Sequence, residues 1–227
     1  MTANSDSIPR ARRSINDLRA PLMMLYVFAF CGGRMAQLPM WVLLAVMAPV
    51  IGVLAFVFER KLMRELLVFR PTNALYGLGA AVLLYGIFSL ALQYASGLFI
   101  GATLDGDGSV PAFFVELVRI KGHASAIHPA IVGIAGAVLL GVSEELFWRG
   151  FVQTRLMIMM PHSLAVILAT VVYTGFYAVL MGTLAAVAAG VCGLIFGVLT
   201  IRLRSLVPAM ICHSLVWLFA LWILPLV

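Results

Sequence analysis

The sequence has little charge for a chain of 227 residues. Only 11% of the residues are charged and 63% are hydrophobic, whereas soluble globular domains have about 25% charged and roughly half apolar residues. This composition excludes a soluble globular domain, and it equally excludes a disordered chain, which needs few apolar residues. Long apolar runs separated by short basic clusters predict a polytopic helical membrane protein.

The sequence contains only three cysteines and no internal repeat. The three cysteines, Cys31, Cys192 and Cys212, lie in apolar stretches without the spacing of metal-ligand motifs. We interpret them as small buried apolar side chains. Neither heptads nor an inverted pair of broken helices is present, which disfavours a transporter. The spacing of Gly193 and Gly197 is interpreted as a helix-packing face.

Positive charge exceeds negative charge, with 15 Lys and Arg against 9 Asp and Glu. The basic residues lie at the ends of apolar segments, which is typical of membrane topology and not of a phosphate-binding surface. With the N-terminus in the cytoplasm, 12 of the 15 fall in cytoplasmic segments, and Arg34, Arg119 and Lys121 fall outside. The sequence therefore predicts a cytoplasmic N-terminus and no nucleic-acid partner.

The chain divides into a basic N-terminal segment, residues 1–20, and a single membrane domain, residues 21–227. The first apolar run, from Pro21, is interpreted as a retained short helix interrupted by Gly32 and Gly33, and not as a cleaved signal peptide. Further spans are predicted at about 38–58, 73–98, from 130, 163–180, 184–199 and 206–225, with a polar stretch at 101–129. The sequence predicts an all-α transmembrane bundle of about seven to eight spans.

Two adjacent acids, Glu144 and Glu145, are the only acidic residues after Glu116. An ionisable residue at membrane depth is costly and indicates a functional site. On a helix, Glu145 and Arg149 share a face, while Glu144 points about 100° away. We predict that Glu145 pairs with Arg149 and that Glu144 occupies an apolar environment suited to a general base. The alternative is that both acids pair with Arg149 and Arg155 at the cytoplasmic boundary.

His213 is the one histidine well inside a predicted span. His123 and His128 belong to the polar stretch, and His162 lies at a Pro-His-Ser turn. A histidine in a membrane helix is also common as a hydrogen-bonded packing residue, and this alternative stays open. Because the glutamate pair is present, we interpret His213 as its partner in a polar site within the membrane.

The motif Glu-Glu-x-x-x-Arg-Gly at residues 144–150, with Ser-Leu-x-Pro-x-x-x-x-His at 205–213, resembles the CPBP family. This is the CAAX protease and bacteriocin-processing family, also called ABI, which includes the type II CAAX prenyl endopeptidases. The resemblance covers about residues 130–220. It implies a glutamate-dependent intramembrane endopeptidase of a bacterial inner membrane that acts on a membrane-associated protein or peptide.

The resemblance also implies roles for individual residues. In the family, the first glutamate and a middle histidine activate a water, and a last histidine and an asparagine stabilise the oxyanion. Glu144 is then the general base, and Glu145 and His213 are catalytic. Tyr177 stands where the middle histidine is expected, and Trp217 stands where the asparagine is expected.

Tyr177 and Trp217 can retain part of the chemistry of the histidine and the asparagine that they replace. The hydroxyl of Tyr177 can position a water but cannot take up a proton near neutral pH, so proton uptake rests on Glu144. The indole N–H of Trp217 can still donate to an oxyanion. Trp217 and Arg149, the partner of Glu145, are the supporting residues of the predicted site. A tilted or broken helix, or a kink near Gly150 or Pro161, is expected, because Glu144 and Tyr177 must reach the same depth.

A metal site and a second function are the remaining alternatives. A catalytic zinc needs about three N, O or S ligands plus water. The candidates are the two glutamates and His213, and Glu145 is committed to Arg149, so we predict neither a metal nor a cofactor. The departures at Tyr177 and Trp217 support an alternative, a catalytically lapsed membrane scaffold, immunity or regulatory protein that binds peptides without cleaving them.

Overall fold

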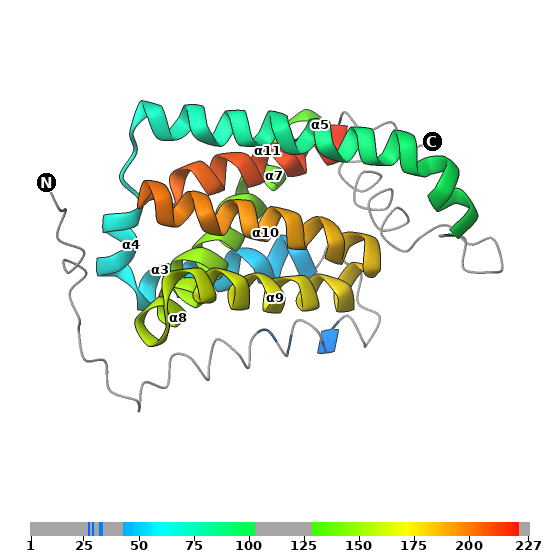
Figure 1. Cartoon of the computed structure of the whole chain (residues 1–227). Helices are drawn as coiled ribbons and strands as arrows, with labels where there is room; N and C mark the ends of the chain where they lie inside the picture. The colour runs from blue at the N-terminus through cyan, green and yellow to red at the C-terminus, as the bar shows by residue number, and fades with distance from the viewer. Residues whose placement is uncertain (1–26, 28, 30–31, 34–42, 103–128, 223–227) are drawn as a thin grey trace, which may run out of the picture.

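A computed structural model describes residues 27, 29, 32–33, 43–102 and 129–222 of the chain. Every element within the two long ranges is helical, so the all-α prediction is confirmed for this part of the chain. The elements are η1 (Leu43–Met47), α3 (Ala48–Phe58), α4 (Arg60–Leu66), α5 (Pro71–Ala102), α7 (Pro129–Glu145), η2 (Leu146–Gln153), α8 (Thr154–Met159), α9 (His162–Met181), α10 (Thr183–Leu203) and α11 (Val207–Trp222) (Figure 1).

Several sequence predictions lie outside the described residues. These are the basic segment 1–20, most of the first span, most of the polar stretch 101–129, and with them Cys31, Arg34, Arg119, Lys121, His123 and His128.

Three of the described helices are long and apolar enough to cross a membrane: the Pro71–Ala91 part of α5, α9 and α10. About 20 apolar residues suffice, because an α-helix rises about 1.5 Å per residue and the hydrocarbon layer is about 30 Å thick. These helices lie at the positions of three predicted spans. Two shorter apolar helices, Ala48–Phe58 and Val207–Phe219, accompany them.

In the described bundle, large apolar side chains face outward and charged side chains lie inside, as in proteins that are embedded in lipid. Large apolar side chains point outward from the long helices, among them Leu75, Leu78, Val82, Leu83 and Ile87 on α5, Ile167 and Val171 on α9, and Val187, Leu194 and Val198 on α10. Charged and polar side chains are buried instead, including Glu144, Glu145, Arg149, Gln153 and His213. A soluble domain would not expose so much apolar surface. In a membrane, that surface contacts acyl chains.

Helix α11 lies at the centre of the packing, against α5, α7 and α10 (Figure 1). Close approach is possible where α7 and its neighbours meet at glycine. A methyl group at Gly141 of α7 would lie 2.5 Å from the backbone nitrogen of Ser214 on α11. Similarly, one at Gly52 of α3 would lie 2.7 Å from the Cα atom of Ser143. Small residues let membrane helices pack tightly, so α3 and α11 approach α7 close to the glutamate pair.

Helices α9 and α10 form a hairpin joined by a single residue, Gly182. Its φ of 86° lies in the region that glycine adopts without strain, so the chain can reverse there. On the facing surface, a methyl group at Gly193 would lie 2.9 Å from the side chain of Thr170, and one at Gly197 would lie 2.8 Å from that of Val166. The Gly193–Gly197 spacing thus forms a packing face of α10 against α9.

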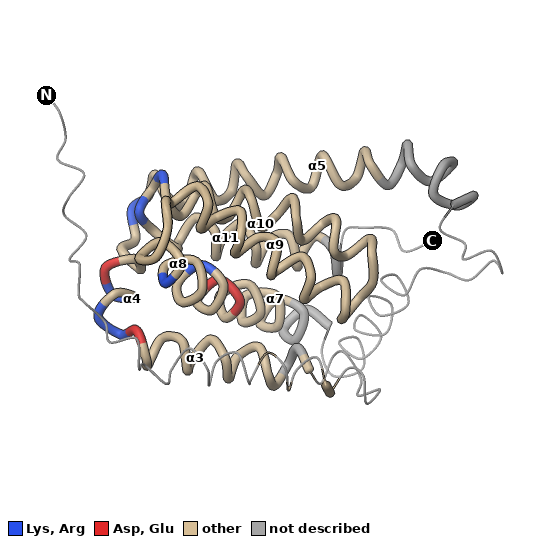
Figure 2. The backbone as a smooth tube through the Cα atoms, turned by 60° about the horizontal axis from the view of Figure 1, so that its bottom comes forward, with Lys and Arg blue, Asp and Glu red and all other residues tan. Residues whose placement is uncertain are grey.

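Lys and Arg gather at the end of the bundle where α4 and α8 lie (Figure 2). The exposed cations are Arg60, Lys61, Arg64, Arg70, Arg202 and Arg204. At the same end, Arg155 Nη2 donates to Oε1 of the buried Glu59 over 2.6 Å, and the guanidinium stacks on Phe151. This pair connects the end of α3 with α8, 96 residues further along the chain.

Candidate active site

The glutamate pair lies at the end of α7, where the helix changes its type. Residues 129–145 are α-helical, and residues 146–153 form the π-helix η2. A π-helix is rare, and its wider turn is often found at functional sites. Both glutamates are buried, with exposed fractions of 5% for Glu144 and 0% for Glu145. The structure has a break between α8 and α9 at Met160 and Pro161, one of the expected features, and Gly150 lies within the π-helix η2.

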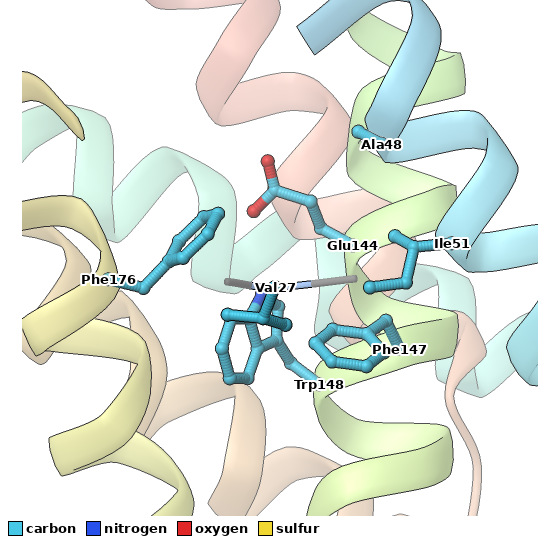
Figure 3. A pocket seen from close by; sticks show the side chains of 7 residues that line it. All are labelled: Val27, Ala48, Ile51, Glu144, Phe147, Trp148 and Phe176. Atoms are coloured by element: carbon cyan, nitrogen blue, oxygen red, sulfur yellow. The ribbon is translucent and has the colours of Figure 1, made fainter. Parts of the chain in front are cut away.

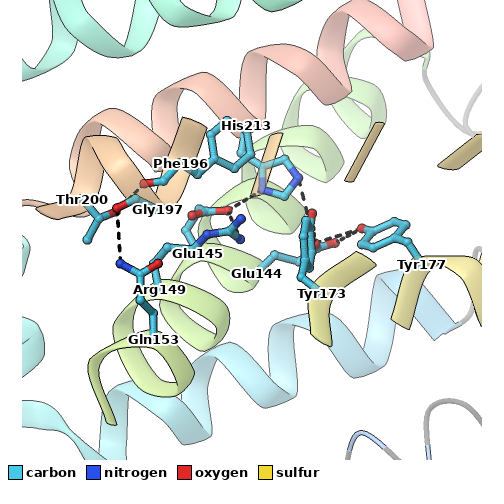
Figure 4. Close-up of polar contacts among 10 residues, drawn as sticks. All are labelled: Glu144, Glu145, Arg149, Gln153, Tyr173, Tyr177, Phe196, Gly197, Thr200 and His213. Atoms are coloured by element: carbon cyan, nitrogen blue, oxygen red, sulfur yellow. Dashed lines mark hydrogen bonds and ion pairs between the residues drawn. The ribbon is translucent and has the colours of Figure 1, made fainter. Parts of the chain in front are cut away.

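One carboxylate oxygen of Glu145, Oε1, contacts two neighbouring side chains. Arg149 Nη1 donates to Oε1 over 3.0 Å, and His213 Nδ1 lies 2.8 Å from the same oxygen (Figure 4). The pairing of Glu145 with Arg149, four residues later, has the predicted i,i+4 geometry. The other oxygen of Glu145, Oε2, is buried and has no hydrogen-bond partner among the described residues.

Aromatic rings hold the guanidinium of Arg149 in place. Its Cζ atom lies 4.6 Å from the ring centre of Tyr173 on α9 and 5.2 Å from that of Phe196 on α10. A cation over an aromatic face is stabilised by about 2 kcal/mol or more when both groups are desolvated. Arg149 is thus fixed by the carboxylate of Glu145 and by rings from two other helices.

Glu144 points to α9 and has no arginine partner in the described structure. Tyr177 Oη lies 2.7 Å from Oε1 and 2.9 Å from Oε2, and Tyr173 Oη donates to Oε2 over 3.2 Å. The divergence of two successive side chains by about 100° explains why the neighbours meet different partners. Both acids were alternatively expected to pair with Arg149 and Arg155, but Arg155 contacts Glu59 instead.

His213 lies between the two carboxylates. While Nδ1 contacts Glu145, Nε2 lies 3.9 Å from Glu144 Oε2, beyond hydrogen-bond length. The imidazole packs against Phe196, with ring centres 5.0 Å apart. His213 comes from α11, the tyrosines from α9 and the glutamates from α7, so three helices supply the cluster (Figure 4).

Trp217 follows His213 by one turn of α11. Its side chain is buried in the same apolar cluster as Tyr173 and Tyr177. The indole N–H has no hydrogen-bond partner among the described residues. A buried donor left unpaired costs about 1–3 kcal/mol. The structure thus places the predicted Trp217 in the apolar core, one helical turn after His213, with its indole N–H unpaired among the described residues.

A small cavity of about 20 Å³ borders Glu144. Apart from the carboxyl group, its walls are formed by apolar and aromatic side chains: Ala48, Ile51 and Phe147 lie on one side, Phe176 lies on the other, and Val27 and Trp148 lie between them (Figure 3). This volume suffices for about one water molecule. The Glu144 carboxylate is the one ionisable group among the lining residues, so a water in this cavity would lie against it.

Two residues of this arrangement were not among the predicted site residues. Tyr173 is four residues before Tyr177, and i,i+4 residues share a helix face, so the second tyrosine hydroxyl could have been expected. Phe196, which contacts both Arg149 and His213, carries no such signal, because one phenylalanine among many on an apolar helix is not distinctive. Within the described ranges, no three His, Cys, Asp or Glu side chains are grouped to hold a metal ion.

The described bundle and its buried acid–histidine cluster define an integral membrane protein with ionisable groups inside its helices. Residues 126–219 match a family model described as type II CAAX prenyl endopeptidase Rce1-like. The match confirms the resemblance to the CPBP family and nearly coincides with the expected range 130–220. The description names an endopeptidase, so the family is one of peptide hydrolases. Neither the curated proteins nor the solved structures contain a match to the chain.

Proposed function

We propose that this protein is a glutamate-dependent intramembrane endopeptidase with Glu144 as the general base. The supporting observation is a buried carboxylate beside a water-sized apolar cavity, with His213 Nε2 only 3.9 Å away. A water bound there would attack a peptide carbonyl while Glu144 accepts its proton. The match of residues 126–219 to an endopeptidase family supports the same reaction.

The other residues of the cluster assist this step. Tyr177 and Tyr173 hold the Glu144 carboxylate in one orientation through their hydroxyls. The unpaired indole N–H of Trp217 is the candidate donor to the oxyanion, which forms in an environment where such a hydrogen bond is strong. Arg149 fixes Glu145 and, through the ring of Tyr173, the position of the tyrosine pair. No metal and no cofactor is needed.

The proposed membrane arrangement is a single domain, residues 21–227, of seven to eight spans in a bacterial inner membrane. The basic segment 1–20 lies in the cytoplasm. The exposed cations at the α4 and α8 end support this orientation, because cytoplasmic loops are rich in Lys and Arg. The substrate is a membrane-associated protein or peptide, and the family description suggests a prenylated C-terminal CAAX peptide as the first candidate.

The test is a cleavage assay with the full chain in liposomes. Prenylated and unprenylated CAAX peptides are offered, and products are identified by mass spectrometry. Glu144→Gln keeps the shape and hydrogen bonding of the side chain but removes the base, so it should abolish cleavage without lowering the melting temperature. The control is Glu65→Gln, since Glu65 is exposed on α4. Cleavage at the wild-type rate by Glu144→Gln would refute the assignment.

A second function is favoured by one observation. Tyrosine hydroxyls contact both oxygens of Glu144, and a carboxylate held in this way has less capacity left for a water. The protein is then a catalytically lapsed scaffold, immunity or regulatory protein that binds peptides without cutting them. Peptide binding by the wild type with no cleavage of any offered peptide would support this function.

A further inference from the structure

The contacts of His213 resemble those of a histidine that transfers protons. One ring nitrogen, Nδ1, lies 2.8 Å from a carboxylate oxygen of Glu145. A carboxylate at this position fixes the ring and stabilises the imidazolium form. The other nitrogen, Nε2, is directed to Glu144, whose Oε2 lies 3.9 Å away. At this separation a water or a substrate atom can lie about 2.8 Å from both groups.

We propose that His213 is the general acid that protonates the leaving amide nitrogen, with Glu145 as its positioning residue. The inference rests on the proposed function, since it concerns the second half of the same hydrolysis. It gives His213 a different role from that of an oxyanion donor, the role implied by the family resemblance. Stabilisation of the oxyanion then depends on Trp217.

The proton transfers balance over one cycle. Glu144 takes one proton from the water as the oxygen bonds to the carbonyl carbon. His213 gives its Nε2 proton to the amide nitrogen as the C–N bond breaks, and the products are a carboxylic acid and an amine. Glu144 then holds a proton and His213 lacks one. Transfer across the 3.9 Å gap, through a water, restores both groups.

Apart from Glu144, which could return the proton that it took from the water, His213 is the described side chain of the cluster that suits this step. If Glu144 supplied the proton, substitution of His213 would leave the amide-to-ester ratio unchanged. The hydroxyls of Tyr173 and Tyr177 are already used in hydrogen bonds to Glu144. The guanidinium of Arg149 does not give up a proton in proteins, and the indole of Trp217 donates a hydrogen bond but transfers no proton. Imidazole, in contrast, gives and takes a proton near neutral pH.

The position of His213 is determined from three sides. Glu145 holds Nδ1, the Phe196 ring packs on the imidazole, and the backbone of α11 approaches α7 closely at Gly141, which contacts Ser214, the residue after His213. The side chain is 4% exposed. Such a fixed imidazole transfers a proton with little reorganisation, which is what acid catalysis requires.

The experiment compares two substrates that differ only in the leaving group. One is the peptide cleaved by the wild type in liposomes, with its cleaved bond identified by mass spectrometry. The other carries an ester in place of that amide. An amine leaves only when protonated, whereas an alkoxide depends much less on an acid. His213→Gln should therefore lower the amide-to-ester ratio of kcat/KM by about 10²-fold or more.

Three further variants and one matched control separate the roles of these residues. Glu144→Gln should slow the amide and the ester equally, because both reactions need an activated water. Any cleavage that Glu145→Gln retains should show an amide-to-ester ratio lowered in the same direction as in His213→Gln, since the imidazolium loses its carboxylate. His213→Asn serves as a second replacement if His213→Gln melts below the wild type. His162→Gln, at the exposed start of α9, is the matched control and should leave the ratio unchanged.

The outcomes distinguish this inference from the proposed function. An unchanged amide-to-ester ratio in both His213 variants, with both substrates slowed alike, would overturn the acid role and leave the endopeptidase intact. If the wild type cleaves neither substrate, the proposed function is wrong and this inference is wrong with it.

Discussion

Adjacent glutamates acquire different chemistry here because neighbouring helices present different groups to them. Glu145 meets a guanidinium and an imidazole, whereas Glu144 meets two phenol hydroxyls and a small apolar cavity. Substitutions at the two positions should therefore affect different properties of the protein. Loss of the Glu144 charge should change the reaction, and loss of the Glu145 charge should also change the stability.

Glu145→Gln should destabilise the protein. Removal of one partner of a buried ion pair leaves the other charge uncompensated, at a cost of about 3–5 kcal/mol. Arg149 is 2% exposed and would lose its carboxylate. The expected result is a lower yield and melting temperature in detergent, together with lost activity. Glu144→Gln is the internal comparison, because it leaves no buried cation unpaired. Equal melting temperatures for Glu145→Gln and the wild type would contradict this prediction.

Tyr177→His should preserve or raise the rate of cleavage. The Tyr177 hydroxyl lies 2.7 Å from Glu144 Oε1, so an imidazole at this position would lie beside the proposed base and could share the proton. Tyr76→His on the exposed face of α5 is the matched control and should leave the rate unchanged. Cleavage is measured on the same peptide for all three proteins. Loss of activity in Tyr177→His with unchanged melting would show that the hydroxyl itself is required.

For individual residues, the sequence predicts those contacts that depend on helix geometry alone. The Glu145–Arg149 pair follows from a spacing of four residues, and it is present. The pairing of Arg155 with Glu59 was not predicted, because it joins residues 96 positions apart. Likewise, no local pattern brings Phe196 against Arg149 and His213. Such contacts depend on how α8, α10 and α11 pack, which periodicity does not determine.

At the scale of helices, close packing at glycine determines the distance between α7 and α11. Gly141→Ala would place a methyl group 2.5 Å from the Ser214 nitrogen, and overpacking of this kind costs about 1–3 kcal/mol. The melting temperature should fall, and cleavage should fall with it because His213 adjoins Ser214. Gly136→Ala on the same helix meets nothing within 4 Å and is the control. A stable, fully active Gly141→Ala would contradict the prediction.

The positions of the helices were largely predictable from the sequence, whereas the π-helical conformation of η2 was not. Apolar runs gave the positions of α5, α9 and α10, because about 20 such residues match the thickness of a bilayer. The π-helical conformation of residues 146–153 could not be predicted, since α- and π-turns accept the same apolar residues. The expected kink at Gly150 indicated only that the helix could not continue regularly.

At the scale of the molecule, charge and hydropathy predict which end faces the cytoplasm. Cysteines introduced one at a time at Lys61, Arg202 and Thr183, all exposed, test this in a background without the native cysteines. A membrane-impermeant maleimide should label Lys61→Cys and Arg202→Cys only from the cytoplasmic side. It should label Thr183→Cys, at the opposite hairpin, only from outside. Labelling of all three from one side would contradict the topology.

The π-helix η2 has a consequence for how the chain tolerates insertions and deletions. A π-turn closes hydrogen bonds between residues i and i+5, one residue more than an α-turn. Loss of one residue from 151–153 would let the segment revert to α-helix, and the narrower turns would offset most of the rotation of about 100° that a deletion causes in an α-helix. Arg149 would keep its position four residues after Glu145 and so its ion pair. The segment between Arg149 and Thr154 should therefore tolerate the loss of one residue better than the α-helical part of α7, although both belong to the helical core around the glutamates.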